Sequence, residues 1–266
     1  MSSTTNTFHH PVPLVAPSPD EVGALLCNQG FVRLDAAGLV ALTGQVPDAL
    51  AGLTQAWQDL PSDTHLKDGG RYRRRRHGSY IQDLDRRTLS CVPHRPHWQP
   101  TTYNALHGGM LRWFEPLGAA LATAPAFLAL IGSLGELVAR AVHRTEAEPA
   151  FDGRWFIEAH PFRIDTTGGV GRPTPEGAHR DGVNFVAVLL VDRHAVRGGE
   201  SRVFAADGPE GVRFTLEEPW SVLLLDDDRV IHETTPIQPA LAEETGWRDT
   251  LVLTYRAGAF QDPPGT

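Results

Sequence analysis

Cysteine and lysine are scarce in this chain of 266 residues. Two cysteines, Cys27 and Cys91, are too few for a disulfide framework, so we expect a reducing, cytoplasmic location. Lys67 is the only lysine, and arginine therefore carries almost all of the positive charge. The formal net charge of −8 at pH 7 argues against general nucleic-acid binding, so we expect no nucleic-acid partner.

Long apolar runs are also missing. The stretch 117–142 is apolar, but Pro125, Gly132, Gly135 and Glu136 interrupt it, so we predict no transmembrane helix and no membrane partner. Residues 1–19 lack the basic start and apolar run of a signal peptide. Their Ser, Thr and Pro content predicts a loose N-terminal arm. The rest of the composition, 41% hydrophobic and 21% charged, is typical of a globular protein.

The first half of the chain predicts helices and a sheet edge. Ser18 and Pro19 suit the start of a helix that ends near Gly30. A short strand over 31–34 and helices over 37–42 and 47–60 follow. Period-two residues over 71–81 indicate one strand turning into another, and 91–103 predicts an irregular edge or lid. The longest helical pattern covers 106–144, with breaks at its glycines and Pro125.

The second half predicts short strands separated by Gly, Pro and Asp turns. That pattern is typical of a sandwich or barrel, and it suits the double-stranded β-helix, or jelly roll, whose interior can hold a metal and small ligands. We therefore predict a mainly β protein with flanking helices, folded as a single domain over 20–266. Helical and edge elements are expected over 20–150 and the jelly-roll core mainly over 151–256. The predicted strands cover 154–164, 183–191, 201–205, 212–215, 220–225, 230–235 and 250–255.

The most informative motif is the only His-x-Asp of the sequence, His179-Arg180-Asp181. In an extended segment alternate side chains share a face, so His179 and Asp181 can hold two positions of one metal ion. His232 begins another apolar segment later in the chain. Two His and one Asp form the facial triad of non-haem Fe(II) oxygenases, which leaves positions open for substrate and oxygen. We therefore predict an iron site made by His179, Asp181 and His232.

An arginine and a threonine after the triad suggest a cosubstrate. If a hairpin joins the strand of His232 to the strand that begins at Arg248, with 235 opposite 247, Arg248 lies about 7 Å along the strand from the level of His232. A guanidinium there can pair with the far carboxylate of 2-oxoglutarate, with a hydrogen bond from Thr250. The predicted cofactors are therefore Fe(II), 2-oxoglutarate and O2.

Two other motifs are weaker. His179-Arg180-Asp181 also matches part of a kinase catalytic loop, but the downstream Asn, the Asp-Phe-Gly and the glycine-rich nucleotide loop are missing. His94 and His97 have no Cys or acidic partner at ligand spacing, which favours surface or packing roles. Neither motif changes the oxygenase interpretation.

Several segments together resemble the bacterial 2-oxoglutarate–Fe dioxygenase family of the L-isoleucine dioxygenase type, which includes the biofilm, stress and motility protein A-like members. They cover most of the chain after about residue 30: 71–73, 108–116, 155–164, 173–182, 198–201, 248–249 and 254–256. The resemblance implies a jelly-roll core and hydroxylation or sulfoxidation of free aliphatic amino acids. By position, His179, Asp181 and His232 match the iron ligands and Arg248 matches the 2-oxoglutarate arginine.

A free L-amino acid as substrate requires groups that satisfy its carboxylate and ammonium. The candidates for the carboxylate are Arg71, Arg73 and Arg75 on one face of the arginine run, and Arg163; Glu158 is the candidate for the ammonium. An equally open reading is that the arginine run forms a solvated strand face.

Two further functions stay open. One is a cupin-like metal-binding stress or sensor module without turnover, and the other is a hydroxylase of peptide or protein side chains. The oligomeric state, the amino acid and the oxidised atom are not predicted.

Overall fold

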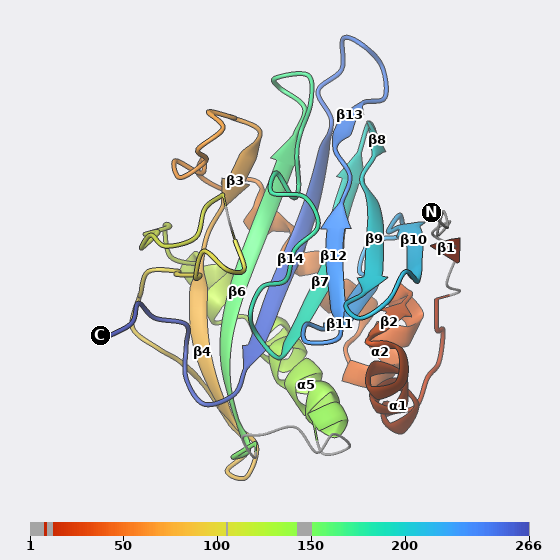
Figure 1. The fold of residues 1–266 in the computed structure, drawn as a ribbon, viewed down its shortest axis with the longest axis vertical. Helices are drawn as coiled ribbons and strands as arrows, with labels where there is room; N and C mark the ends of the chain where they lie inside the picture. The colour runs from red at the N-terminus through yellow and green to blue at the C-terminus, as the bar shows by residue number, and fades with distance from the viewer. Residues whose placement is uncertain (1–7, 10–12, 105, 143–150, 266) are drawn as a thin grey trace, which may run out of the picture.

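The computed structural model describes residues 8–9, 13–104, 106–142 and 151–265. Its helices gather at one end and behind the sheets (Figure 1). They are α1 (Pro19–Gln29), α2 (Ala36–Thr43), α3 (Pro47–Leu53) with the 3₁₀ turn η1 (Thr54–Trp57), α4 (Ala119–Ala122) and α5 (Pro125–Val142). The Ser18 side chain caps α1, and Gly30 ends it in the left-handed conformation, as predicted.

The larger sheet follows the order β2-β11-β7-β14-β6-β4-β5. Its three central strands are the longest, with 10 to 12 residues, and each pairs on both sides. The bounds are β2 (Phe31–Leu34), β11 (Val222–Asp226), β7 (Phe185–His194), β14 (Trp247–Arg256), β6 (Arg154–Asp165), β4 (Gly78–Asp83) and β5 (Thr88–Cys91), with β3 (Arg73–Arg75) also on β6.

A smaller sheet faces it in the order β1-β10-β9-β12. Its strands are β1 (Phe8–His9), β10 (Gly211–Thr215), β9 (Glu200–Ala205) and β12 (Val230–Thr234). A further pair joins β8 (Val196–Gly198) to β13 (Ile237–Pro239). The pairs β7–β11, β9–β10, β9–β12 and β6–β14 are antiparallel, which confirms the predicted mainly β jelly-roll class.

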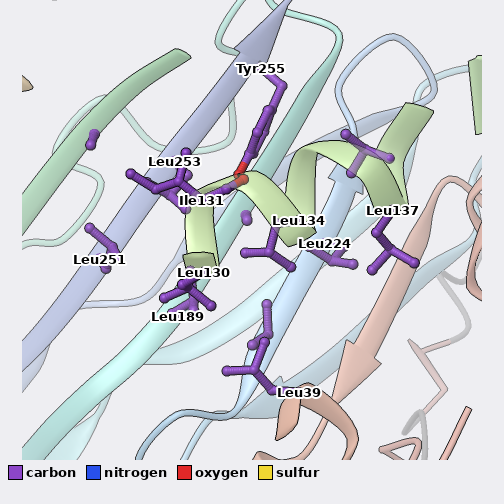
Figure 2. Packing of buried hydrophobic residues seen from close by; sticks show 14 of the residues in the cluster. Leu39, Leu130, Ile131, Leu134, Leu137, Leu189, Leu224, Leu251, Leu253 and Tyr255 are labelled. Carbon is purple, nitrogen blue, oxygen red and sulfur yellow. The ribbon is translucent and has the colours of Figure 1, made fainter. Parts of the chain in front are cut away.

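The main apolar core lies between the larger sheet and α5. Figure 2 shows Ile131 of α5 beside Leu253 of β14, and Leu134 of α5 beside Leu224 of β11. The hydroxyl of Tyr255 donates to the carbonyl of Ile131 at 2.9 Å, so a polar contact fixes the helix on the sheet. By length and composition α5 resembles a membrane span, but half of it is buried in the protein as a core helix.

Two predicted elements are wrong in detail. Residues 106–118 are turns and bridges rather than helix. A Cβ on Gly108 would lie 2.4 Å from the carbonyl oxygen of Asn104, and Gly109 has φ +74°, so a compact loop replaces the helix here. The predicted turn within 71–81 is also absent, because β3 and β4 follow the same edge of β6 in one register.

The predicted N-terminal arm is described only in part, since residues 1–7 and 10–12 lie outside the described residues. Within the described part, β1 pairs with β10, and Leu14 bridges to Leu34 of β2. This part of the arm therefore pairs with both sheets. The single-domain boundaries stay a prediction.

Candidate metal centre

A cavity of about 130 Å³ is lined by residues of the larger sheet and of the smaller sheet that faces it. Strand β14 forms one wall of the cavity. Alternate side chains of a strand point to opposite faces, so one set from β14 faces the cavity and the other faces α5. The wall residues from β14 are Arg248, Thr250, Val252 and Thr254. The opposite side carries His232 of β12 and the segment from Pro173 to Val183.

The three predicted metal ligands meet in this cavity. His179 precedes β7 and forms an antiparallel bridge to His232, with both backbone hydrogen bonds at 3.0 Å. Asp181 Oδ1 lies 3.9 Å from His179 Nε2, and Asp181 Oδ2 lies 3.7 Å from His232 Nε2. The ligating atoms all lie within 4.8 Å of one another, as a shared ion requires.

The hydrogen bonds of His179 select the nitrogen that faces a metal. Nδ1 lies 2.9 Å from the carbonyl oxygen of Gly177, so Nδ1 carries the proton and Nε2 keeps its lone pair. Burial lowers the pKa of His179, but the Asp181 and Glu176 carboxylates outweigh it and raise the pKa overall. Burial and the charge of His179 hold the pKa of His232 well below its usual value.

A second layer of residues fixes Asp181. The buried carboxylate of Asp227 accepts from the backbone N–H groups of Asp181, Gly182 and Val183 at 3.0, 2.7 and 3.2 Å. The Gln99 amide donates to Asp181 Oδ1 at 3.1 Å. Burial and the Asp181 charge raise the pKa of Asp227 to about 7. Two imidazole nitrogens and an oriented carboxylate are the donor set of a non-haem Fe(II) centre, so these residues fit the ion.

Arg248 reaches the cavity by a different route from the one predicted. The assumed hairpin is wrong, because β14 pairs with β6 and β7, and β12 pairs with β9 of the smaller sheet. Arg248 nevertheless lines the same cavity as His232, with 2% exposure. Its Nε and Nη2 have no hydrogen-bond partner among the described residues. Burial and Arg193 lower its pKa to about 10, so the site fits an incoming carboxylate.

The predicted substrate arginines fall into two groups. Arg73 and Arg75 of β3 line the cavity with 5% and 4% exposure. Arg71 is exposed and lies outside the cavity lining. Arg163 is held by Asp249 at 2.8 and 2.6 Å, and it also lies outside the lining. The wholly solvated reading of the run is therefore wrong, since two of its arginines are buried.

Glu158 also lines the cavity, but its oxygens are already hydrogen-bonded. Oε1 lies 3.1 Å from His77 Nε2, and Oε2 lies 2.9 Å from His97 Nδ1. With His160, these residues form a buried cluster of metal-ligand types. Arg75 Nη2 lies 2.6 Å from His160 Nδ1, and a guanidinium this close opposes a second cation. His97 is therefore a buried Glu158 partner on the cavity wall rather than a surface or packing residue.

Several polar residues of the cavity were not predicted from the sequence. Gln99, Arg112 and Glu176 are among them. Arg112 lies in the stretch predicted as helix, and Gln99 in a segment predicted to be irregular. Glu176 lies three residues before His179, and this short spacing from a predicted ligand was the signal that could have placed it at the site.

Comparisons with known proteins agree with this geometry. The model of the 2OG-Fe dioxygenase family matches residues 54–254. The crystal structure of a bsmA homolog from Methylobium petroleophilum PM1 is 55% identical, with a TM-score of 0.87 over 97% of this chain and 100% of that chain. No curated protein matches the chain significantly.

Two more distant structures share the fold. IDO from Bacillus thuringiensis has a TM-score of 0.72 at 18% identity, over 91% of this chain and 100% of that chain. TqaL, described as an Fe(II)/(alpha)ketoglutarate-dependent dioxygenase, has a TM-score of 0.69 at 18% identity, over 93% of this chain and 92% of that chain. At this identity the likeness shows the fold alone.

Proposed function

Because the chain belongs to the 2OG-Fe dioxygenase family, we propose that this oxidoreductase hydroxylates or sulfoxidises a free L-amino acid. The family uses Fe(II), 2-oxoglutarate and O2, and these supply the oxidising chemistry when bound. His179, Asp181 and His232 would hold the iron, and the orphaned guanidinium of Arg248 would bind the far carboxylate of 2-oxoglutarate. Thr250 lines the same wall and offers a hydroxyl.

The observation that carries the amino-acid proposal is the charge of the cavity wall. Beyond Arg248, the wall holds charged side chains of both signs. Arg73, Arg75, Arg112 and Glu158 are buried, and Glu176 is half-buried. A small zwitterion brings one charge of each sign into an enclosed site, so it can satisfy both kinds of group. The resemblance to the L-isoleucine dioxygenase type supports an aliphatic side chain.

The alternatives fit the cavity less well. A peptide segment brings neutral amides in place of charged ends, so it would leave buried charges without partners. A metal-binding sensor without turnover has no use for Arg248, whose buried charge has no partner among the described residues. We also propose a cytoplasmic location, from the low cysteine content.

The test is a succinate-release screen over the twenty L-amino acids with purified protein and 2-oxoglutarate, with and without Fe(II). We expect Fe(II)-dependent succinate with one or a few amino acids and a product that has gained one oxygen atom by mass spectrometry. His179→Ala is the control and should abolish both signals. Succinate without any oxygenated amino acid would contradict the proposed substrate class.

A further inference from the structure

Arg112, which is buried, and Glu176, which is half-buried, are two groups of opposite charge that face one cavity without pairing. Both line the space that also holds the triad. No salt bridge joins them in the described part of the chain, although Glu176 influences the titration of Arg112. A charge that is removed from water is costly unless it has a partner, so a guanidinium and a carboxylate that stay unpaired on one cavity wall are each short of a partner. The open pair therefore marks a place for a ligand that carries both charges.

The Arg112 guanidinium has unused hydrogen-bonding capacity. Its side chain is fixed by one bond, from Nη2 to Gln99 Oε1 at 2.8 Å. Nε is buried without a partner among the described residues, and the residue is only 2% exposed. Burial and Arg73 lower its pKa to about 10, so a carboxylate would relieve a strained charge. Arg73, by contrast, is already paired with Asp63 at 2.7 Å.

Glu176 has the complementary free group. Its Oε2 is buried and has no hydrogen-bond partner among the described residues. Its Oε1 lies 3.8 Å from Nε2 of His179, so the carboxylate sits beside the metal ligands. Glu158 differs because both of its oxygens are bonded to histidines. Of the two carboxylates, Glu176 therefore has the oxygen open to an ammonium.

We propose that Arg112 and Glu176 bind the α-carboxylate and the α-ammonium of the amino-acid substrate. This inference rests on the proposed function and assigns the ammonium to Glu176 in place of Glu158. Gln99 strengthens it, because the same amide group accepts from Arg112 and donates to Asp181. The carboxylate subsite is therefore tied to a predicted iron ligand through one side chain.

The experiment uses chemical analogues with matched variants. The probes are the best L-amino acid from the screen, its primary amide, which lacks the carboxylate charge, and its des-amino acid, which lacks the ammonium. Dissociation constants are measured by anaerobic calorimetry on full-length protein loaded with Mn(II) and 2-oxoglutarate. For the wild type, each analogue should bind at least tenfold more weakly than the amino acid, about 1.4 kcal/mol.

Each variant should remove one of these preferences. Arg112→Met should bring the amino acid and its amide to within threefold of each other and keep the preference over the des-amino acid. Glu176→Gln should bring the amino acid and its des-amino acid to within threefold of each other and keep the preference over the amide. Arg86→Met, at an exposed turn paired with Asp83, and Glu244→Gln, on an exposed loop, are the controls and should keep both preferences.

The outcomes separate this inference from the proposed function. If the wild type oxygenates an amino acid but Arg112→Met keeps the preference over the amide, Arg112 is not the carboxylate site. Loss of the ammonium preference in Glu158→Gln, with Glu176→Gln unchanged, would overturn the other half. If no amino acid is oxygenated, the proposed function itself fails. Should either variant fail to fold, Arg112→Gln and Glu176→Ala also remove the charge and carry the same comparison, and unchanged preferences in both would overturn the inference.

Discussion

Replacing Arg248 with methionine should change cosubstrate affinity and protein stability in opposite directions. The guanidinium is buried in the cavity, and two of its nitrogens have no partner among the described residues. Truncating one member of a buried charge pair costs about 2–5 kcal/mol. We therefore expect the dissociation constant for 2-oxoglutarate to rise about 30- to 4,000-fold. Metal binding should be nearly unchanged, because Arg248 contributes no ligand to the triad.

The same substitution should stabilise the protein without cosubstrate. Burial and Arg193 lower the pKa of Arg248 to about 10. Because the pKa of this base is lower in the folded state, the charged form disfavours folding at neutral pH, by about 3 kcal/mol. Methionine keeps much of the apolar stem and removes the charge. The free energy of unfolding should therefore rise, by up to about 3 kcal/mol before any loss of packing.

Calorimetry with 2-oxoglutarate and urea unfolding of the metal-free protein check the two effects. Arg256→Met is the matched control, since Arg256 lies at the other end of the same strand and donates to the carbonyls of Ala259 and Phe260. It should leave cosubstrate affinity unchanged. An affinity change below threefold in Arg248→Met would refute the assignment, and lower stability would refute the account of an unpaired buried charge.

Four further predictions concern the metal centre. His179→Ala and His232→Ala should each lose stoichiometric Fe(II) in metal analysis; tight iron in both would contradict the triad. The pKa of His179 is raised, so a proton competes with the metal from above pH 6.5 downward, and titrations should show Fe(II) affinity falling as pH drops. Asp227→Ala should weaken Fe(II) binding about 10- to 100-fold by freeing the Asp181 loop, whereas exposed Asp228→Ala should not. If Asp181 is an iron ligand, it would occupy the coordination position that a halide needs, so reactions in chloride buffer should give hydroxylated product, and chlorinated product would argue against this.

The sequence predicted the strands well, and it named three side chains that the fold brings together, because both follow from local patterns. Period-two apolar runs gave nearly the observed bounds of β6, β9 and β10. His179 and Asp181 are neighbours in the chain, so their proximity needed no knowledge of the fold. His232 required only that its strand reach the same cavity.

The polar wall was not predictable in the same way. Arg112 and Gln99 meet through a loop that Gly108 and Gly109 shape, and the apolar residues around it follow a helical period. The hairpin assumed for Arg248 failed because sequence neighbours in a jelly roll often belong to opposite sheets. Which arginines of the 71–76 run face inward depended on the partner strand β6, which lies far away in sequence.

The two faces of β14 have separate tasks, and this separation bears on how the enzyme can diversify. Leu251, Leu253 and Tyr255 are fully buried in the core with α5, while Val252 and Thr254 border the cavity. Substitutions at 252 and 254 can therefore reshape the substrate space while the core stays intact. A one-residue shift in this strand would exchange the two sets and lose both packing and chemistry. Relatives that accept different side chains are expected to vary at 252 and 254 and to keep the length of β14.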